Sequence, residues 1–290
     1  ILVSFEVYQR THPLIAYEAQ PMVTFGKPAR SIRVFRPMHV QADRHTAHGL
    51  FGKYVLMIGR RAILEDLHRA FDNMCATHHS RVALVTGEVG QGKSRLIREF
   101  REAVYHSGIP IYQGDCMTYA RAKPLHLFAN LLRDILDLSE SDPPDVQLAA
   151  LRATLDRLSI DNPDTLSYVS GILGLERGDD HRQMRLRNID EAVLQKMTHT
   201  VLQQIIVATA QLTPAVLIFE DLHWVDAASR DVLVHLLRAI DDVPVLMILV
   251  SRDAERDTVI QPLIAAANER HDALLDLHLA PLPDVDLAQL

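Results

Sequence analysis

The sequence predicts an α/β fold in three layers, in which helices cover both faces of a parallel sheet. From Tyr54 onward, short apolar runs rich in β-branched residues alternate with segments of helical periodicity. A glycine-rich loop joins one such run, 81–86, to the helical segment after it. Two later runs end in charged residues, at 220–221 and at Arg252. Continuous apolar runs are typical of parallel strands buried on both faces, so the three observations favour the same fold class.

The composition is that of an ordinary globular protein. Hydrophobic residues make up 48% and charged residues 23% of the 290 residues, which excludes wholesale disorder. The longest apolar run, 243–250, is too short for a membrane span. Two cysteines exclude a disulfide framework and favour the cytoplasm. The start, ILVSFEVYQR, has no Met and no basic leader, so it indicates a cut fragment and not a signal peptide.

Charge is distributed unevenly along the chain. Residues 1–60 contain 8 Lys and Arg against 3 Asp and Glu, although the whole chain has a net charge of −7. This difference indicates two parts of separate origin. The acidic balance of the larger part argues against a nucleic-acid-binding surface there.

The N-terminal part is predicted to contain two short strands. They lie in YEAQPMVTFG and ARSIRVFRPM, around a turn at 26–28. The polar, aperiodic stretch after them is predicted to be a linker. Its histidines, at 39, 45 and 48, suggest a metal site, but no cysteine or acidic cluster has ligand spacing, so we expect solvated side chains. The expected organisation is a remnant at 1–37, a linker at 38–53 and the main domain at 54–290.

The stretch LVTGEVGQGKSRL has the GxxxxGK[ST] spacing of a phosphate-binding loop. Its glycines allow successive backbone amides to face inward, the lysine supplies charge for the β and γ phosphates, and the serine hydroxyl can ligate Mg²⁺. A predicted strand precedes the loop and a predicted helix follows, whose N-terminal dipole favours an anion. The candidate phosphate contacts are Gly87, Glu88, Val89, Gly90, Gln91, Gly92, Lys93, Ser94 and Arg95.

A second strand, in GIPIYQGDC, and a long helical insertion are predicted to follow. From Lys123 to Leu212 the periodicity is largely helical, with turns at Pro143 and Pro144 and around 178–180.

The second half of the candidate site follows the apolar run 216–219. A buried parallel strand there would deliver Glu220 and Asp221 to its C-terminal edge, where ligands bind in open α/β sheets. One of the two carboxylates can hold Mg²⁺ while the other orients the water that attacks the γ phosphate. The run 243–250 is predicted to end at the same edge, where Arg252 can sense the γ phosphate.

Together these segments resemble the AAA-like ATPases of the STAND class, the signal-transduction ATPases with numerous domains. The resemblance rests on six motifs, in the family's order over residues 56–290: MIGRRAILEDL, LVTGEVGQGKSRL, IYQGDC…KPLHLFANLLRDIL, VLIFEDLHWVD, MILVSR and LHLAPLPDVDLAQL. Membership implies a five-stranded parallel P-loop NTPase core that binds ATP and Mg²⁺, acts as a conformational switch and hydrolyses ATP slowly.

The resemblance also implies roles for individual residues. In chain order they are adenine-side contacts for Gly59 and Arg60, phosphate and Mg²⁺ contacts for Lys93 and Ser94, the metal-side acid for Glu220, the catalytic acid for Asp221 and the sensor for Arg252. The assignment of the two acids can be reversed. Four residues depart from the family's pattern. Arg61 replaces the usual Glu on the adenine side, and Glu220 replaces the more widespread Asp, which favours a metal contact through water. Val89 and Gln91 stand where Pro and Ile are frequent, and we expect these two changes to leave the loop amides available.

The first residues resemble a different family. ILVSFEVYQRT followed by YEAQPMVTFGKPARSIRVFRP is similar to the last helix and strands of a class III adenylate/guanylate cyclase domain, over residues 1–37. The metal-binding aspartates of that family would lie upstream of Ile1, so we expect no cyclase activity from this chain.

These observations support a leading hypothesis and two alternatives. The first is a cytoplasmic ATP/ADP switch that regulates an adjoining cyclase domain in its parent protein, under a protein or small-molecule effector. The second is the same ATPase in a transcriptional regulator that reads DNA through a downstream helix-turn-helix. The third, a P-loop kinase, is disfavoured because paired acids suit the activation of water.

Overall fold

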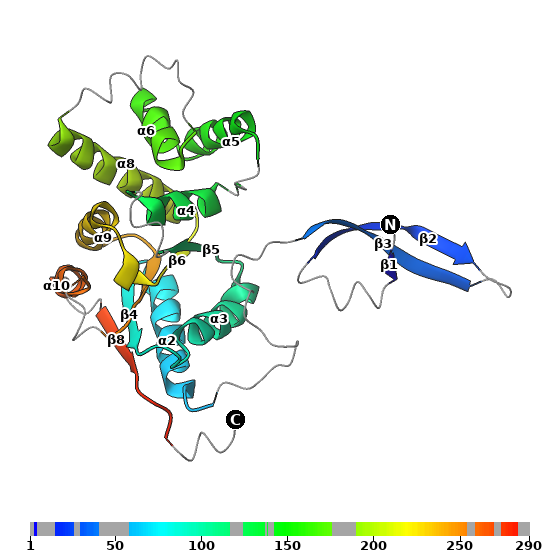
Figure 1. The fold of residues 1–290 in the computed structure, drawn as a ribbon, viewed down its shortest axis with the longest axis horizontal. Helices are drawn as coiled ribbons and strands as arrows, with labels where there is room; N and C mark the ends of the chain where they lie inside the picture. The colour runs from blue at the N-terminus through cyan, green and yellow to red at the C-terminus, as the bar shows by residue number, and fades with distance from the viewer. Residues whose placement is uncertain are drawn as a thin grey trace. The chain divides into compact units, whose positions relative to one another are not determined.

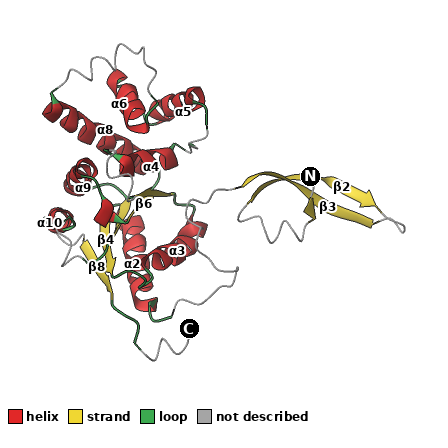
Figure 2. Cartoon of the chain, in the orientation of Figure 1, coloured by secondary structure: helices red, strands yellow, loops and turns green. Residues whose placement is uncertain are grey.

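The computed structural model describes residues 3–4, 15–25, 30–40, 58–116, 124–136, 138, 142–175, 190–253, 259–269 and 274–283. Contacts divide the chain into two compact units, residues 1–56 and 57–290 (Figures 1 and 2). Each unit has its own sheet.

The smaller unit contains a three-stranded antiparallel sheet in the order β1-β3-β2. Its strands are β1 (Val3–Ser4), β2 (Ile15–Phe25) and β3 (Arg30–Val40). The two strands predicted around the turn at 26–28 are therefore confirmed. The described residues of this unit are all in strands, so the helix expected in the remnant is not found among them.

β3 is longer than the sequence pattern indicated. It runs three residues past the expected end of the remnant at residue 37, because β2 begins early enough to pair Ile15 with Val40 and Ala16 with His39. His39 therefore lies in a strand and not in a linker. The other two histidines of the metal hypothesis, His45 and His48, lie outside the described residues.

The larger unit is built on a sheet of five parallel strands in the order β5-β6-β7-β4-β8. The strands are β4 (Arg81–Gly87), β5 (Ile111–Asp115), β6 (Ala215–Glu220), β7 (Val245–Val250) and β8 (Leu274–Leu279). The predicted five-stranded parallel sheet is thus confirmed. All the strands point the same way, so their carboxyl ends meet at one edge.

Helices cover both faces of this sheet and complete the three layers (Figure 1). Successive strand residues point to opposite faces. In β7, Leu246 and Ile248 pack with one helical layer, whereas Met247 and Leu249 pack with the other. The first layer is α2 (Arg61–Thr77) and α3 (Lys93–Val104), and the second includes α9 (Ala227–Ala239) and α10 (Gln261–Asn268).

The predicted helical insertion lies between β5 and β6. It consists of α4 (His126–Ile135), α5 (Pro144–Arg157), α6 (Pro163–Leu173) and α8 (Glu191–Leu212). The predicted turn at Pro143 and Pro144 is in part a helix start: Pro144 is the first residue of α5, where the missing N–H of proline costs no hydrogen bond. The turn predicted around 178–180 lies outside the described residues.

Both cysteines of the chain are free thiols in the described part of the larger unit. Burial raises the pKa of Cys116, and partial burial raises that of Cys75. Both residues are therefore thiols and not thiolates. Within the residues that the structure describes, no helix has both the length and the apolar character needed to cross a membrane.

Candidate functional site

The glycine loop lies at the carboxyl edge of the sheet, between β4 and α3. Gly92 precedes α3 with a φ of 88°, a left-handed conformation that favours glycine. At Gly87, a Cβ atom would lie 2.8 Å from the backbone oxygen of Leu279 at the end of β8, so no larger residue fits without a shift. The two glycines therefore set the path of the loop against β8 and into the helix.

Lys93 spans the loop from its far end. Its Nζ donates to the backbone oxygen of Gly87 at 2.7 Å and to that of Glu88 at 3.0 Å. Burial lowers the pKa of Lys93, while Asp221 raises it and Arg252 lowers it further. The structure thus brings the lysine, the acid and the arginine into electrostatic range of one another, although the lysine begins α3 and the other two follow β6 and β7.

Gln91 folds back into the loop. Its Oε1 accepts a hydrogen bond from the backbone N–H of Glu88 at 2.8 Å. The expectation that residues 89 and 91 leave the loop amides available is therefore wrong for the amide of Glu88, because glutamine has an acceptor oxygen that isoleucine lacks. Val89 is 71% exposed at the tip of the loop, beside Gly90.

A hydrogen bond joins the two halves of the candidate site. Ser94, in the first turn of α3, donates from its Oγ to Glu220 Oε2 at 2.9 Å. Gln113 Nε2 donates to the other carboxylate oxygen at 3.1 Å, so Glu220 is held from both sides. Burial raises the pKa of Glu220, the hydroxyl of Ser94 lowers it, and the nearby Asp115 raises it again.

Gln113 is itself oriented by neighbouring side chains. Arg101 of α3 donates to its Oε1 at 2.6 Å, and its Nε2 also donates to Asp115 Oδ1 at 2.8 Å. Asp115 is the register partner of Glu220 across the β5–β6 pair. A chain of hydrogen bonds from α3 through β5 therefore fixes the acid at the end of β6.

Asp221 and Arg252 lie at the mouth of the site. Asp221 has a φ of 56°, a conformation that aspartate tolerates better than most residues, and it turns the chain from β6 into the short helix η4 (Leu222–Trp224). Its carboxylate is exposed, with Oδ1 4.0 Å from Nδ1 of His223. Arg252 is also exposed, and its guanidinium lies over the ring of Trp224.

Gly59 and Arg60 lie directly before α2. Arg60 is buried and donates to the backbone oxygen of Ala280, just after β8. Because the preceding residue, Leu279, also lies against Gly87, the end of β8 connects the Gly59–Arg60 turn to the phosphate loop. Arg61 is exposed and pairs with Glu65 one turn along its helix.

The last of the predicted loop contacts, Arg95, lies in the first turn of α3. Its Nε is 3.8 Å from Glu99 Oε1, one turn further along the same helix.

Four residues of the site were not predicted: Arg101, Gln113, Asp115 and Trp224. Asp115 carried a usable signal, because it ends a predicted parallel strand and must therefore lie at the same edge as the acid pair. Gln113 and Arg101 carried none, since a polar residue inside a short strand and a charged residue on a helix are both common on surfaces.

The donor set fits Mg²⁺ and a phosphate. A hydroxyl and a carboxylate 2.9 Å apart are oxygen ligands of the kind that Mg²⁺ prefers. Among the described residues, no cluster of three or more His, Cys, Asp or Glu is placed to hold a metal ion. Beside Gly90 and Gly92 a Cβ atom would meet no atom within 4 Å, so the loop leaves open space next to its amides.

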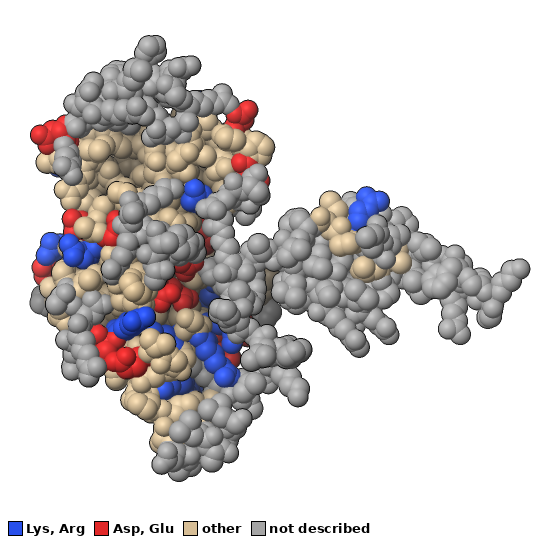
Figure 3. Space-filling view, in the orientation of Figure 1, with Lys and Arg blue, Asp and Glu red and all other residues tan. Residues whose placement is uncertain are grey.

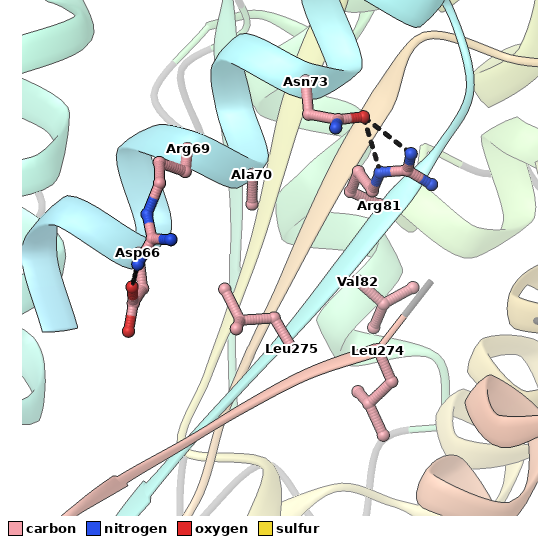
Figure 4. A pocket seen from close by; sticks show the side chains of 8 residues that line it. All are labelled: Asp66, Arg69, Ala70, Asn73, Arg81, Val82, Leu274 and Leu275. Carbon is pink, nitrogen blue, oxygen red and sulfur yellow. Dashed lines mark hydrogen bonds and ion pairs between the residues drawn. The ribbon is translucent and has the colours of Figure 1, made fainter. Parts of the chain in front are cut away.

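A separate cavity of about 330 Å³ lies at the opposite end of the sheet (Figure 4). Arg81 and Leu274, the first residues of β4 and β8, line it, and α2 contributes its outer wall. Asn73 accepts two hydrogen bonds from Arg81 across its rim. None of the predicted site residues lines this cavity, so it is not the candidate site.

Comparisons with known proteins place the larger unit in a family. A family model described as an AAA ATPase domain matches residues 57–248. An uncharacterized protein of Rhizobium meliloti (strain 1021) is 28% identical over 256 residues, which cover 87% of this chain and 24% of the relative. This chain therefore spans about a quarter of the length of that relative.

Two solved structures are also among the matches. The Orc1 protein of Aeropyrum pernix, solved in complex with DNA, is 12% identical with a TM-score of 0.42, over 80% of this chain and 48% of that one. Cdc6p of Pyrobaculum aerophilum is 12% identical with a TM-score of 0.43, over 83% of this chain and 52% of that one. The family match covers more than half of the chain, and with it the loop, Ser94 and the acid pair: the chain belongs to the AAA ATPase domain family.

Proposed function

We propose that this chain is an ATP-dependent switch that binds ATP with Mg²⁺ and hydrolyses it slowly. The observation that carries the proposal is the 2.9 Å hydrogen bond from Ser94 to Glu220, because it joins residues 126 positions apart at one edge of the sheet. With Lys93 in the adjoining loop, this edge combines the groups that grip phosphate with the groups that hold a metal. An effector would act through a difference in its affinity for the two nucleotide states.

Each residue would then have a distinct role. Lys93 would leave the loop carbonyls to contact the β and γ phosphates, and Ser94 and Glu220 would hold Mg²⁺. Asp221, exposed at the mouth, would orient the attacking water, and Arg252 would contact the γ phosphate. Mg²⁺, when bound, would neutralise charge on the phosphates. Gly59 and Arg60 would lie on the adenine side, while Arg95 would stay on α3.

We further propose that the switch regulates a class III cyclase domain in its parent protein. The resemblance of residues 1–37 and the antiparallel sheet of the smaller unit support this role. We propose a cytoplasmic location, which the two free cysteines support. On the face seen in Figure 3, described acidic and basic side chains are intermixed, which agrees with a partner other than nucleic acid. Cyclic-nucleotide production by the parent protein, with and without Lys93→Ala, tests the cyclase role, and equal production contradicts it.

The nucleotide proposal is tested by titrating the purified chain with fluorescent analogues of ATP, ADP and GTP, with and without Mg²⁺. We expect saturable, Mg²⁺-dependent binding of the ATP analogue. In a parallel assay with γ-labelled ATP, the label should appear slowly as free phosphate, because the acid pair suits water activation. Absence of ATP binding would contradict the proposal, and transfer of the label to an acceptor would indicate a kinase instead.

Replacing Gln113 by leucine is expected to raise the Mg²⁺ concentration that nucleotide binding requires, through its effect on Glu220. The variant removes the hydrogen bond to Glu220 Oε1, so the carboxylate is no longer fixed from both sides. Loss of such an orienting partner typically lowers metal affinity by about tenfold or more. The Mg²⁺ concentration at half-maximal ATP binding measures the effect. Gln195→Leu, at an exposed position on α8, is the matched control, and equal Mg²⁺ dependence in the two variants would rule out this role for Gln113.

A further inference from the structure

The one tryptophan of the chain lies beside the proposed γ-phosphate sensor. The guanidinium carbon of Arg252 is 5.6 Å from the centroid of the Trp224 ring. An indole face attracts a cation more strongly than any other side-chain ring. Arg252 follows β7 and Trp224 follows β6, so this contact connects the ends of two neighbouring strands.

Arg252 lies at the end of the strand that neighbours the one leading into the phosphate loop. β7 pairs with β4, and the N–H of Ser251, the residue before Arg252, donates to the backbone oxygen of Val85 in β4 at 3.0 Å. The stack on Trp224 therefore holds the guanidinium at the edge of the sheet where the phosphates would bind.

Trp224 is well placed to act as a fixed support. Its backbone N–H donates to the oxygen of Asp221 at 2.8 Å, and the N–H of Val225 donates to Leu222 at 3.0 Å. Leu222 is fully buried, and the ring of His223 lies 5.1 Å from the indole. The turn that carries the indole is thus anchored at both ends.

The residue after this turn adds a further anchor. Asp226 accepts hydrogen bonds from the N–H and Oγ of Ser229, at 2.9 and 2.6 Å, and so caps α9. It also accepts one from the N–H of Leu125, at 3.2 Å, at the start of α4.

Without such a support, an exposed arginine at a strand end samples many rotamers. Ordering its side chain would then cost conformational entropy when a ligand binds.

We propose that Trp224 is a positioning residue that pre-organises Arg252 for the γ phosphate and thereby sets the preference for ATP over ADP. The inference rests on the proposed function, since it assumes that ATP binds at the loop. ADP has no γ phosphate, so the stack contributes to the binding of ATP alone. Trp224 acts through Arg252 and does not itself contact the nucleotide.

Affinities of ATP and ADP for four variants test this inference. Trp224→Leu should weaken ATP binding by about two- to fivefold, the value of an exposed cation–π contact, and leave ADP binding unchanged. Trp224→Phe, which keeps a ring face, should lose less. Arg252→Ala should lose at least as much as Trp224→Leu, and the double variant should lose no more than Arg252→Ala. Tyr105→Leu is the control, because Tyr105 is an exposed aromatic residue that follows the C-terminal end of α3.

Two results would overturn the inference. If Trp224→Leu weakens ATP and ADP equally, the tryptophan only supports the fold. If the losses of Trp224→Leu and Arg252→Ala are additive, Trp224 does not act through the arginine. Far-ultraviolet circular dichroism identifies a variant that has not folded. If Trp224→Leu does not fold, the nucleotide affinities of Trp224→Phe and the fluorescence of the parental chain test the inference instead.

Tryptophan fluorescence of the parental chain gives an independent reading. Because the chain has one tryptophan, all of the indole emission comes from Trp224. Saturation with Mg²⁺ and a non-hydrolysable ATP analogue should change this emission, since a phosphate would neutralise the charge over the ring, and ADP should not. Arg252→Ala should abolish the difference. An equal response to ADP, or an unchanged ATP response in Arg252→Ala, contradicts the inference.

Equilibrium dialysis with radiolabelled nucleotides distinguishes a failure of this inference from a failure of the proposed function. If the parental chain binds neither ATP nor ADP, both the proposed function and this inference fail. If ATP binds but its preference over ADP is the same in Trp224→Leu, the inference fails while the proposed function stands.

Discussion

Replacing Lys93 by alanine is expected to weaken ATP binding by about tenfold to hundredfold. The lysine crosses the loop, with its Nζ 2.7 Å from the backbone oxygen of Gly87. A hydrogen bond between charged groups is worth about 1.5–3 kcal/mol, which corresponds to this range of affinity. The partial burial that lowers the pKa of Lys93 also makes its charge more effective toward a phosphate, because surrounding protein screens it less than water does.

Titration of the variant with a fluorescent ATP analogue measures the effect. Lys196→Ala is the matched control, because this lysine is exposed on α8 and lies outside the candidate site. Lys93→Arg provides a second comparison: it keeps the charge but replaces the compact ammonium with a planar group, so binding should fall by an intermediate amount. An ATP affinity for Lys93→Ala equal to that of Lys196→Ala would exclude the loop as the phosphate site.

The arrangement of the site could be predicted wherever a spacing rule fixes geometry. The GxxxxGK[ST] spacing places Lys93 and Ser94 at a helix start, and an apolar run ending in acids places Glu220 at a strand end. Parallel strands must then bring both to one edge of the sheet. On α3 the apolar residues Leu96, Ile97, Phe100 and Val104 recur at helical spacing and are buried, whereas Ala103 is exposed.

The remaining features depend on side-chain conformations that no spacing rule specifies. Gln91 is a loop residue in the sequence, and only its folded rotamer brings Oε1 to the amide of Glu88. Gln113 has its role because β5 pairs with β6 in a register that sets Asp115 beside Glu220. The extension of β3 to Val40 likewise follows from where β2 begins, since a strand end is set by its partner.

Replacing Asp221 by asparagine is expected to keep ATP binding and to lower the rate of hydrolysis by about a hundredfold or more. A positioned group that accepts or directs a proton contributes about 10²–10⁴-fold to a rate. Asparagine suits this test better than alanine, because it preserves the shape of the side chain and tolerates the φ of 56° at this position. Single-turnover release of labelled phosphate measures hydrolysis, and fluorescent ATP measures binding. Asp242→Asn, an exposed acid in the turn before β7, is the control.

The same pair of measurements decides between the two acids. Glu220 is hydrogen-bonded on both oxygens, at 2.9 and 3.1 Å, whereas Asp221 is exposed at the mouth. A fixed carboxylate beside a serine hydroxyl suits a metal ligand, and an exposed one suits a group that meets water. Glu220→Gln should therefore raise the Mg²⁺ requirement, and Asp221→Asn should leave it unchanged. If Asp221→Asn raises the Mg²⁺ requirement and Glu220→Gln does not, Asp221 is the metal ligand and Glu220 the catalytic acid. If Asp221→Asn hydrolyses ATP as fast as the parental chain, Asp221 has no part in hydrolysis.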